Sequence, residues 1–148
     1  MREAIRLADS AVRNGNHPFG AVLVHQAEII LHAENTVNTA HDVTNHAETN
    51  LVRLAAGQHD VAFLADCTLY TSTEPCAMCT GAIYWSGISS VVYGCSAQRL
   101  YQIVGEGGLH ISCREILAAG DRTVEVVGPL LEEDAVQSHL HYWNTLED

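Results

Sequence analysis

The 148-residue sequence predicts an α/β fold in which helices cover both faces of a five-stranded mixed sheet. Short apolar runs, typical of buried strands, alternate along the chain with amphipathic helical segments. One helical segment separates the last two predicted strands, so these strands are expected to run parallel through a right-handed crossover. With 47% hydrophobic and 17% charged residues, the whole chain, residues 1–148, is expected to form a single domain.

The first half of the chain predicts a helix, a β-hairpin, a loop and a second helix. The expected segments are a helix at Arg2–Val12, strands at Ala21–Val24 and Glu28–Ala33, a polar loop at Asn35–Asn45 and a helix from His46 to Gly57. Thr44 or Asn45 is the expected N-cap of the second helix, and Gly57 is its expected end. His46 and Glu48 would then lie on the first turn of that helix.

The second half alternates strands with helices. The expected segments are strands at Cys67–Ser72, Ser89–Gly94 and Thr123–Val127 and helices at Cys76–Trp85, Ile111–Ala119 and Leu131–Leu146. Residues Ala97–His110 contain glycines and show little periodicity. This segment is therefore expected to be a loop over a pocket or an ordinary surface connection.

Charge and cysteine content exclude several classes of protein. The formal net charge is −11, and all seven basic residues are arginines. Nucleic-acid binding relies on Lys and Arg that neutralise phosphates, so a long RNA or DNA substrate is disfavoured unless several arginines cluster. Residues 1–15 lack the apolar run of a signal peptide, and no segment is long and apolar enough to span a membrane. The odd number of cysteines, five, argues against a disulfide framework and favours the cytoplasm.

Two cysteines and a distant histidine form a candidate metal site. Cys76 and Cys79 lie three residues apart at the start of a predicted helix, where the helix dipole favours thiolates. His46, about thirty residues upstream, can supply a third ligand. Three protein ligands leave the fourth position of a tetrahedral zinc for water, as in catalytic zinc sites. Glu48 is then placed to move protons to and from that water.

Other interpretations of these residues remain open. A Cys-x-x-Cys pair can be a redox site, and His46 alone could be an ordinary surface or capping residue. A structural zinc would need a fourth ligand, but the other cysteines, Cys67, Cys95 and Cys113, occur singly in apolar surroundings typical of buried thiols. Glu48 alone could be a carboxylate that favours a helix N-terminus. Only the combination of spacings supports a catalytic zinc.

Three segments resemble the zinc-dependent cytidine and deoxycytidylate deaminase superfamily, especially its branch of guanine deaminases and tRNA adenosine deaminases. These segments are His46-Ala47-Glu48, Thr73-Glu74-Pro75-Cys76-Ala77-Met78-Cys79 and Pro18-Phe19-Gly20-Ala21-Val22. The resemblance runs from the first helix to about Gly94 and implies a three-layer α/β/α fold of the cytidine-deaminase type.

The resemblance also assigns roles to individual residues. It implies one Zn²⁺ per chain, held by His46, Cys76 and Cys79, with Glu48 as the catalytic proton shuttle. It further implies that four residues contact the substrate: Asn35 and the Ala47 backbone N–H by hydrogen bonds, and Phe19 and Trp85 as apolar walls.

The implied activity is hydrolytic deamination of a free nucleobase or related amino-heterocycle, such as a guanine-like purine, cytosine or an aminotriazine. The alternatives are a tRNA-specific adenosine deaminase and a non-catalytic zinc-binding partner subunit. Beyond Gly94 the resemblance fades, so Glu106 and His110 are the candidates for reading the far edge of the base. A homodimer is expected, with Leu140-His141-Tyr142-Trp143 as a candidate contact. Together with His139, these C-terminal aromatic residues could instead close the pocket of the same or a neighbouring subunit, or simply pack the last helix.

Overall fold

The computed structural model describes residues 1–145, so Leu146, the expected end of the last helix, lies outside the described residues. Within them a five-stranded sheet has the strand order β2-β1-β3-β4-β5. The strands are β1 (Gly20–His25), β2 (Glu28–Glu34), β3 (Cys67–Thr73), β4 (Ser90–Cys95) and β5 (Glu125–Val127). The helices are α1 (Arg2–Arg13), α2 (Val37–Ala40), α3 (Ala47–Gln58), α4 (Val61–Leu64), α5 (Ala77–Ser86), α6 (Ala97–Val104), α7 (Cys113–Ala118) and α8 (Glu132–Asn144).

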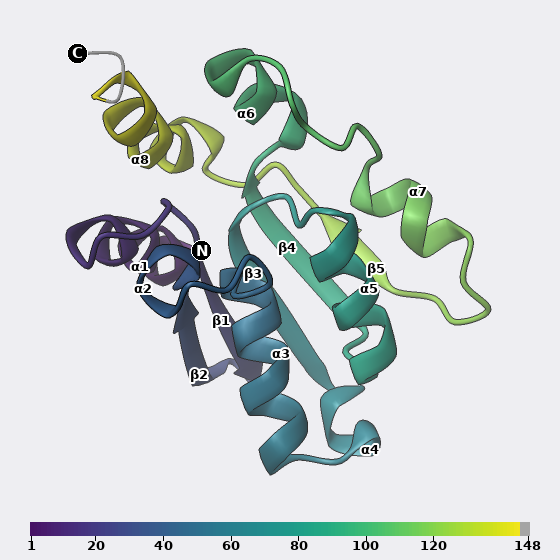
Figure 1. Cartoon of the computed structure of the whole chain (residues 1–148). Helices are drawn as coiled ribbons and strands as arrows, with labels where there is room; N and C mark the ends of the chain where they lie inside the picture. The colour runs from purple at the N-terminus through teal and green to yellow at the C-terminus, as the bar shows by residue number, and fades with distance from the viewer. Residues whose placement is uncertain (146–148) are drawn as a thin grey trace.

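The sheet lies between two helical layers, which confirms the predicted fold. Helices α3 and α5 cover one face of the sheet, with α7 beside α5, and α1 and α8 pack on the other face (Figure 1). None of the helices in the described residues is both long and apolar enough to span a membrane.

Strand directions explain where the site lies. β1 is antiparallel to both β2 and β3, whereas β3, β4 and β5 run parallel to one another. The predicted parallel pairing of the last two strands is therefore confirmed. Because α5 connects the parallel strands β3 and β4, its first turn lies at the carboxyl end of β3. In open α/β sheets, this end of the strands is where ligands bind.

The main core lies between the sheet and the layer of α3 and α5. Leu23, Leu69 and Val91, from the three central strands, are fully buried against Leu51 of α3 and Ile83 of α5. Burying an aliphatic side chain of this size stabilises the fold by about 1.5–3 kcal/mol. This packing holds α3 and α5 side by side, so that their N-terminal ends lie close together.

A glycine allows α1 to pack closely on the opposite face of the sheet. A Cβ atom at Gly20 would lie 2.3 Å from the carbonyl oxygen of Ala4 and 2.5 Å from the Cβ of Leu7. No side chain larger than hydrogen fits there unless α1 moves. The glycine of the Pro18-Phe19-Gly20 segment therefore serves helix packing, and it fixes Phe19 immediately before β1.

Two segments expected to be loops contain helices. Residues 97–104 form α6, because the Ser96 hydroxyl accepts a hydrogen bond from the Arg99 N–H, and Leu100 and Ile103 pack on a small buried cluster with α8. Glycines 105, 107 and 108 follow the helix instead of interrupting it. The loop at residues 35–45 likewise contains the single-turn helix α2.

His139 of α8 is completely buried beneath Phe19, with ring centroids 5.2 Å apart. Its Nδ1 lies 3.4 Å from the Trp143 indole N–H and accepts a hydrogen bond from it, so its Nε2 carries the proton and donates to Thr73 Oγ1 at 2.7 Å. Burial lowers the pKa of His139 to about 4. The imidazole is therefore neutral at pH 7 and ties α8 to the end of β3.

Acidification is expected to destabilise the protein through His139. Because its pKa is about 4 in the folded chain and about 6.5 when unfolded, the unfolded state binds the proton first as the pH falls from 6.5 towards 4. This difference predicts a loss of about 2 kcal/mol in the free energy of unfolding between pH 7 and pH 5. Urea denaturation at both pH values should show that His139→Gln removes this part of the pH dependence. His141→Gln, at an exposed position of the same helix, should retain it.

Candidate active site

The three candidate ligands come together at the N-terminal ends of two helices. His46 is the N-cap of α3, Cys76 is the N-cap of α5, and Cys79 follows within the first turn of α5. The expected cap of α3, Thr44 or Asn45, is therefore wrong, because His46 itself has the extended backbone of an N-cap residue. Gly57 lies within α3 instead of ending it. The positive ends of both helix dipoles point at the same place, which favours anionic ligands there.

The spacing of the three donor atoms fits a tetrahedral metal ion. The His46 Nδ1 lies 3.6 Å from the Cys76 Sγ and 3.5 Å from the Cys79 Sγ, and the three atoms all lie within 4.8 Å of one another. With Zn–S and Zn–N bonds of about 2.3 and 2.05 Å, a tetrahedral angle places nitrogen and sulfur about 3.6 Å apart. A set of two thiolates and one imidazole is also a donor set that suits zinc.

The electrostatics of the site favour one thiolate. Hydrogen bonding from Cys79 and His46 lowers the pKa of Cys76 to about 4. The hydrogen bond to Cys76, together with burial, raises the pKa of Cys79. The hydrogen bond to Cys76 also raises the pKa of His46. A cation bound by all three groups must displace the remaining thiol and imidazole protons, so its affinity is expected to fall with falling pH.

Glu48 lies on the first turn of α3 and is almost completely buried, with 3% of its surface exposed. Its Oε1 accepts a hydrogen bond of 2.6 Å from the Thr71 hydroxyl of β3. Burial is the main cause of the raised pKa of Glu48, whereas the hydrogen bond from Thr71 acts to lower this pKa. A buried carboxyl group with a raised pKa suits general acid–base catalysis.

A cavity of about 170 Å³ adjoins the ligands. Its lining residues are Phe19, His46, Glu48, Glu74, Pro75, Cys76, Ala97, Leu100, Tyr101 and Ile111. Phe19, which packs on His139 of α8, contributes to its apolar lining together with Leu100 and Tyr101 of α6 and Ile111. The cavity adjoins an outer groove of about 770 Å³, which shares Tyr101 and Ile111 and includes His110. The cavity therefore combines apolar side chains with the polar groups of the candidate site.

Glu74 attaches the wall of the cavity to the metal-binding segment. One carboxylate oxygen accepts the Ala97 N–H at 2.9 Å, and the other accepts the Cys113 N–H at 3.2 Å. These are the first residues of α6 and α7, and each helix presents unpaired N–H groups at its start. A single side chain in the Glu74-Pro75-Cys76 segment thus fixes α6, which carries Leu100 and Tyr101, and α7, which follows Ile111.

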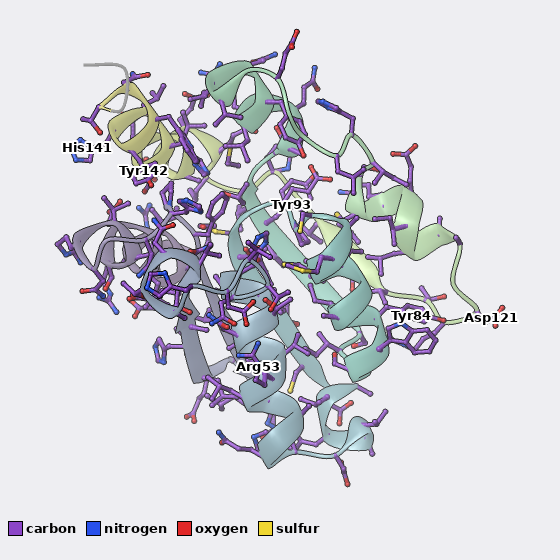
Figure 2. All side chains as sticks on the ribbon, in the orientation of Figure 1. Arg53, Tyr84, Tyr93, Asp121, His141 and Tyr142 are labelled. Atoms are coloured by element: carbon purple, nitrogen blue, oxygen red, sulfur yellow. The ribbon has the colours of Figure 1, made fainter. Side chains whose placement is uncertain are left out.

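The structure does not bring all of the predicted substrate residues into the cavity. Trp85 is 83% exposed and packs on Tyr84, which lies near Asp121 at the periphery of the molecule (Figure 2). Trp85 therefore does not line the cavity of this chain. Six residues along a helix rotate a side chain by about 240°, so Trp85 points away from the face that carries Cys79. Glu106 is exposed and lines neither the cavity nor the outer groove.

The other predicted contacts lie close to the site. Phe19 lines the cavity, and His110 lines the outer groove with its ring 4.4 Å from that of Tyr101. Ala47 is buried in the first turn of α3, where backbone N–H groups lack helical partners. Asn35 is buried, and its side-chain oxygen accepts the Val37 N–H at 3.0 Å. Whether these residues contact a substrate stays a prediction.

Comparison with known proteins identifies the family. Residues 1–95 match the cytidine and deoxycytidylate deaminase zinc-binding region. The chain belongs to this family. It is a zinc-dependent hydrolytic deaminase, as the sequence predicted, and the matched region contains His46, Glu48, Cys76 and Cys79. The cavity wall formed by α6 and Ile111 lies beyond this region.

Relatives of the deaminase include a probable cytosine deaminase and guanine deaminases. It is 43% identical to a probable cytosine deaminase of Schizosaccharomyces pombe over 97% of this chain and 90% of that protein. It is 45% identical to the guanine deaminase of Bacillus subtilis over 63% of this chain and 60% of that protein. The structure of guanine deaminase from Nitrosomonas europaea superimposes with a TM-score of 0.81 and 26% identity, covering 97% of this chain and 82% of that one.

Sequence reasoning missed Thr71 and the two α6 residues that line the cavity, Leu100 and Tyr101. Thr71 precedes the metal-binding segment by only a few residues, but a threonine in a strand has an ordinary structural explanation. Leu100 and Tyr101 were assigned to a loop, although Ser96 at the N-cap position and apolar residues at helical spacing indicate α6.

Proposed function

We propose that this deaminase hydrolyses the exocyclic amino group of a free nucleobase or a related amino-heterocycle, with cytosine and guanine as the first candidates. The observation that carries the proposal is the buried Glu48 beside a three-ligand site, in a cavity of about 170 Å³. Pockets for drug-sized ligands hold about 300–1,000 Å³, so this cavity suits one flat heterocycle.

The chain's own residues account for substrate binding and for the proton transfers. Phe19 and Tyr101 both line the cavity and would pack against the ring. Zinc held by His46, Cys76 and Cys79 would lower the pKa of a water in its open fourth position to near 7. Glu48 would take one proton from the attacking water and deliver it to the ring nitrogen. It would then take the second proton from the newly added hydroxyl group and deliver it to the amine, which leaves as ammonia as the carbonyl forms.

The specific base is best sought among the substrates of the relatives. One relative that aligns with almost the whole chain is a probable cytosine deaminase, which supports a pyrimidine. The similarity to guanine deaminases supports a purine instead. Both bases present an amino-bearing carbon next to a ring nitrogen, so the site chemistry is compatible with either.

A tRNA substrate is the weaker candidate, although a tRNA-specific adenosine deaminase of Aquifex aeolicus is 37% identical over 93 residues. The net charge of −11 opposes binding to an RNA backbone. Arg114 and Arg122 also donate hydrogen bonds to backbone carbonyls, which reduces their availability for phosphates. A non-catalytic partner subunit is disfavoured by the complete ligand set and the buried Glu48.

Ammonia release from a panel of amino-heterocycles is the direct test. Purines, pyrimidines, pteridines, triazines, their nucleosides and tRNA should be compared at equal enzyme concentration. Turnover of a free base above that of its nucleoside and of tRNA would support the proposal. Inosine formation in tRNA without turnover of any free base would overturn it.

The kcat/KM is expected to depend on Tyr101 and not on Glu106. Stacking of a base on an aromatic side chain contributes about 1–3 kcal/mol, so Tyr101→Ala should lower kcat/KM about tenfold or more. Glu106→Gln, in the exposed segment after α6, is the control and should leave kcat/KM unchanged. Steady-state kinetics on the two best substrates test this, and an effect of Glu106→Gln as large as that of Tyr101→Ala would contradict the assigned wall.

Homodimer formation and a cytoplasmic location stay predictions. The expected contact at Leu140-His141-Tyr142-Trp143 is already engaged within the chain. Leu140 packs with α6 residues on a buried cluster, and Trp143 contacts His139 and Tyr142. His141 and Tyr142 lie on α8, well away from Tyr84 at the end of α5 (Figure 2). The aromatic residues of α8 therefore have partners without a second copy.

A further inference from the structure

Thr71 lies directly behind the proposed proton shuttle. Its side chain is fully buried, and its hydroxyl oxygen lies 2.6 Å from Glu48 Oε1 and 3.0 Å from the carbonyl oxygen of Thr73. A hydroxyl has one hydrogen and donates to one acceptor at a time. Hydrogen bonds from a hydroxyl to an ionised carboxylate have lengths of about 2.5–2.7 Å. The shorter contact, to Glu48, is therefore the favoured one when that carboxylate is charged.

The backbone of Thr71 is held at the centre of the sheet. It pairs with Ala21 of β1 on one side and with Tyr93 of β4 on the other. A β-branched side chain in a strand has restricted χ1 freedom, so the hydroxyl has a defined position. Glu48, by contrast, has a long side chain on the first turn of α3, with several rotatable bonds between its backbone and its carboxylate.

The contact constrains one carboxylate oxygen only. Oε1 is engaged by Thr71, which leaves Oε2 for the proton transfers in the cavity that Glu48 lines. A proton on Oε2 still leaves Oε1 able to accept the Thr71 hydrogen bond. The carboxyl group therefore keeps its orientation through each proton transfer, and an orientation fixed in advance lowers the barrier to reaction.

We propose that Thr71 is the positioning residue that aligns the Glu48 carboxylate for proton transfer between water and substrate. The inference rests on the proposed role of Glu48 and extends it to a strand residue outside the metal-binding segments. Thr71 touches neither the substrate cavity nor the ligands, so it acts only through Glu48.

Thr71→Val and Thr71→Ser form a matched pair of variants. Valine keeps the shape of threonine and removes the hydroxyl, whereas serine keeps the hydroxyl and removes the methyl group. A misplacement of about 1 Å in an active site costs up to about 10²-fold in rate. Thr71→Val is therefore expected to lower kcat about 10- to 100-fold at unchanged KM, and Thr71→Ser should stay within about threefold of the parent, both with one zinc per chain.

Three results would overturn the inference. They are an unchanged kcat in Thr71→Val, equal losses of kcat in Thr71→Val and Thr71→Ser, or a lower kcat/KM that comes from a higher KM and not from a lower kcat. A crystal structure of Thr71→Val provides a readout independent of activity and should show the Glu48 carboxylate displaced from its position beside β3. If Thr71→Val does not fold, Thr71→Ala gives the same comparison with Thr71→Ser.

The Glu48→Gln background separates this inference from the proposed function. Adding Thr71→Val to Glu48→Gln should lower the residual rate by less than twofold, because the two residues act as one unit. If Thr71→Val lowered the rate of Glu48→Gln by the same factor as it lowers the rate of the parent, Thr71 would act through a group other than Glu48. If Glu48→Gln alone retained near-normal turnover, the proposed role of Glu48 as proton shuttle would fail. If Glu48→Gln were inactive while Thr71→Val was normal, only the role of Thr71 would be wrong.

Discussion

Glu48→Gln is expected to lower kcat by about 10²- to 10⁴-fold, the contribution typical of a positioned general acid–base residue. Glutamine keeps the size of the side chain and can still accept the hydrogen bond from Thr71, but it cannot carry protons between the water and the ring. Glu48 is not one of the three grouped ligands, so zinc content should remain one per chain. Ammonia release and metal analysis on the same preparation measure both quantities.

The matched control for this variant is Glu106→Gln, which makes the same chemical change at an exposed position. It should keep the parent's kcat. A Glu48→Gln enzyme with near-normal kcat would show that another group transfers the protons. A variant that is inactive because it has lost zinc would instead assign Glu48 to the metal site.

Cys76→Ala is expected to abolish both zinc binding and activity. Two ligands hold zinc far more weakly than three, and without the ion the attacking water loses its activation. Because metal binding is coupled to folding, the variant should also have a lower Tm than the zinc-loaded parent. Metal analysis, ammonia release and thermal unfolding with and without a chelator measure these effects.

Cys67→Ala is the appropriate control, since Cys67 is a buried free thiol in β3, outside the ligand group. It should keep one zinc per chain and the parent's response to chelator. The chelator should lower the Tm of the parent and of Cys67→Ala but leave that of Cys76→Ala unchanged. Retention of a full zinc in Cys76→Ala would disprove the ligand assignment.

The sequence predicted the parts of the fold that depend on short-range pattern. Apolar runs located every strand to within a few residues, and the helix between the last two strands predicted their parallel direction. The ligands were found because the spacing of Cys76 and Cys79 and the His46–Glu48 pair reflect local helix geometry. Packing of Leu51 and Ile83 on the sheet then brings the two helix ends together, a long-range effect that spacing alone does not specify.

The residues that the structure places differently from the sequence analysis are those whose position depends on the direction of a side chain or on the three-dimensional packing of the chain. Trp85 has the right chemistry and lies near Cys79 in sequence, but the rotation of α5 turns it towards solvent. Glu106 was selected because the family resemblance fades there, whereas the wall of the cavity is formed by α6 just before it. His46 was not expected at an N-cap, because its role at that position depends on a metal ion and not on a side-chain hydrogen bond to the helix.

The attachment of α6 and α7 to Glu74 has an evolutionary consequence. Glu74 binds backbone N–H groups, which every amino acid except proline provides, so the side chains at positions 97 and 113 can change without loss of either bond. The residues that form the wall can therefore diverge between descendants while the segment stays anchored to an unchanged catalytic half. New base preferences could then arise through substitutions in residues 96–112. Proline at 97 or 113 is excluded, because it would remove an N–H group that Glu74 binds.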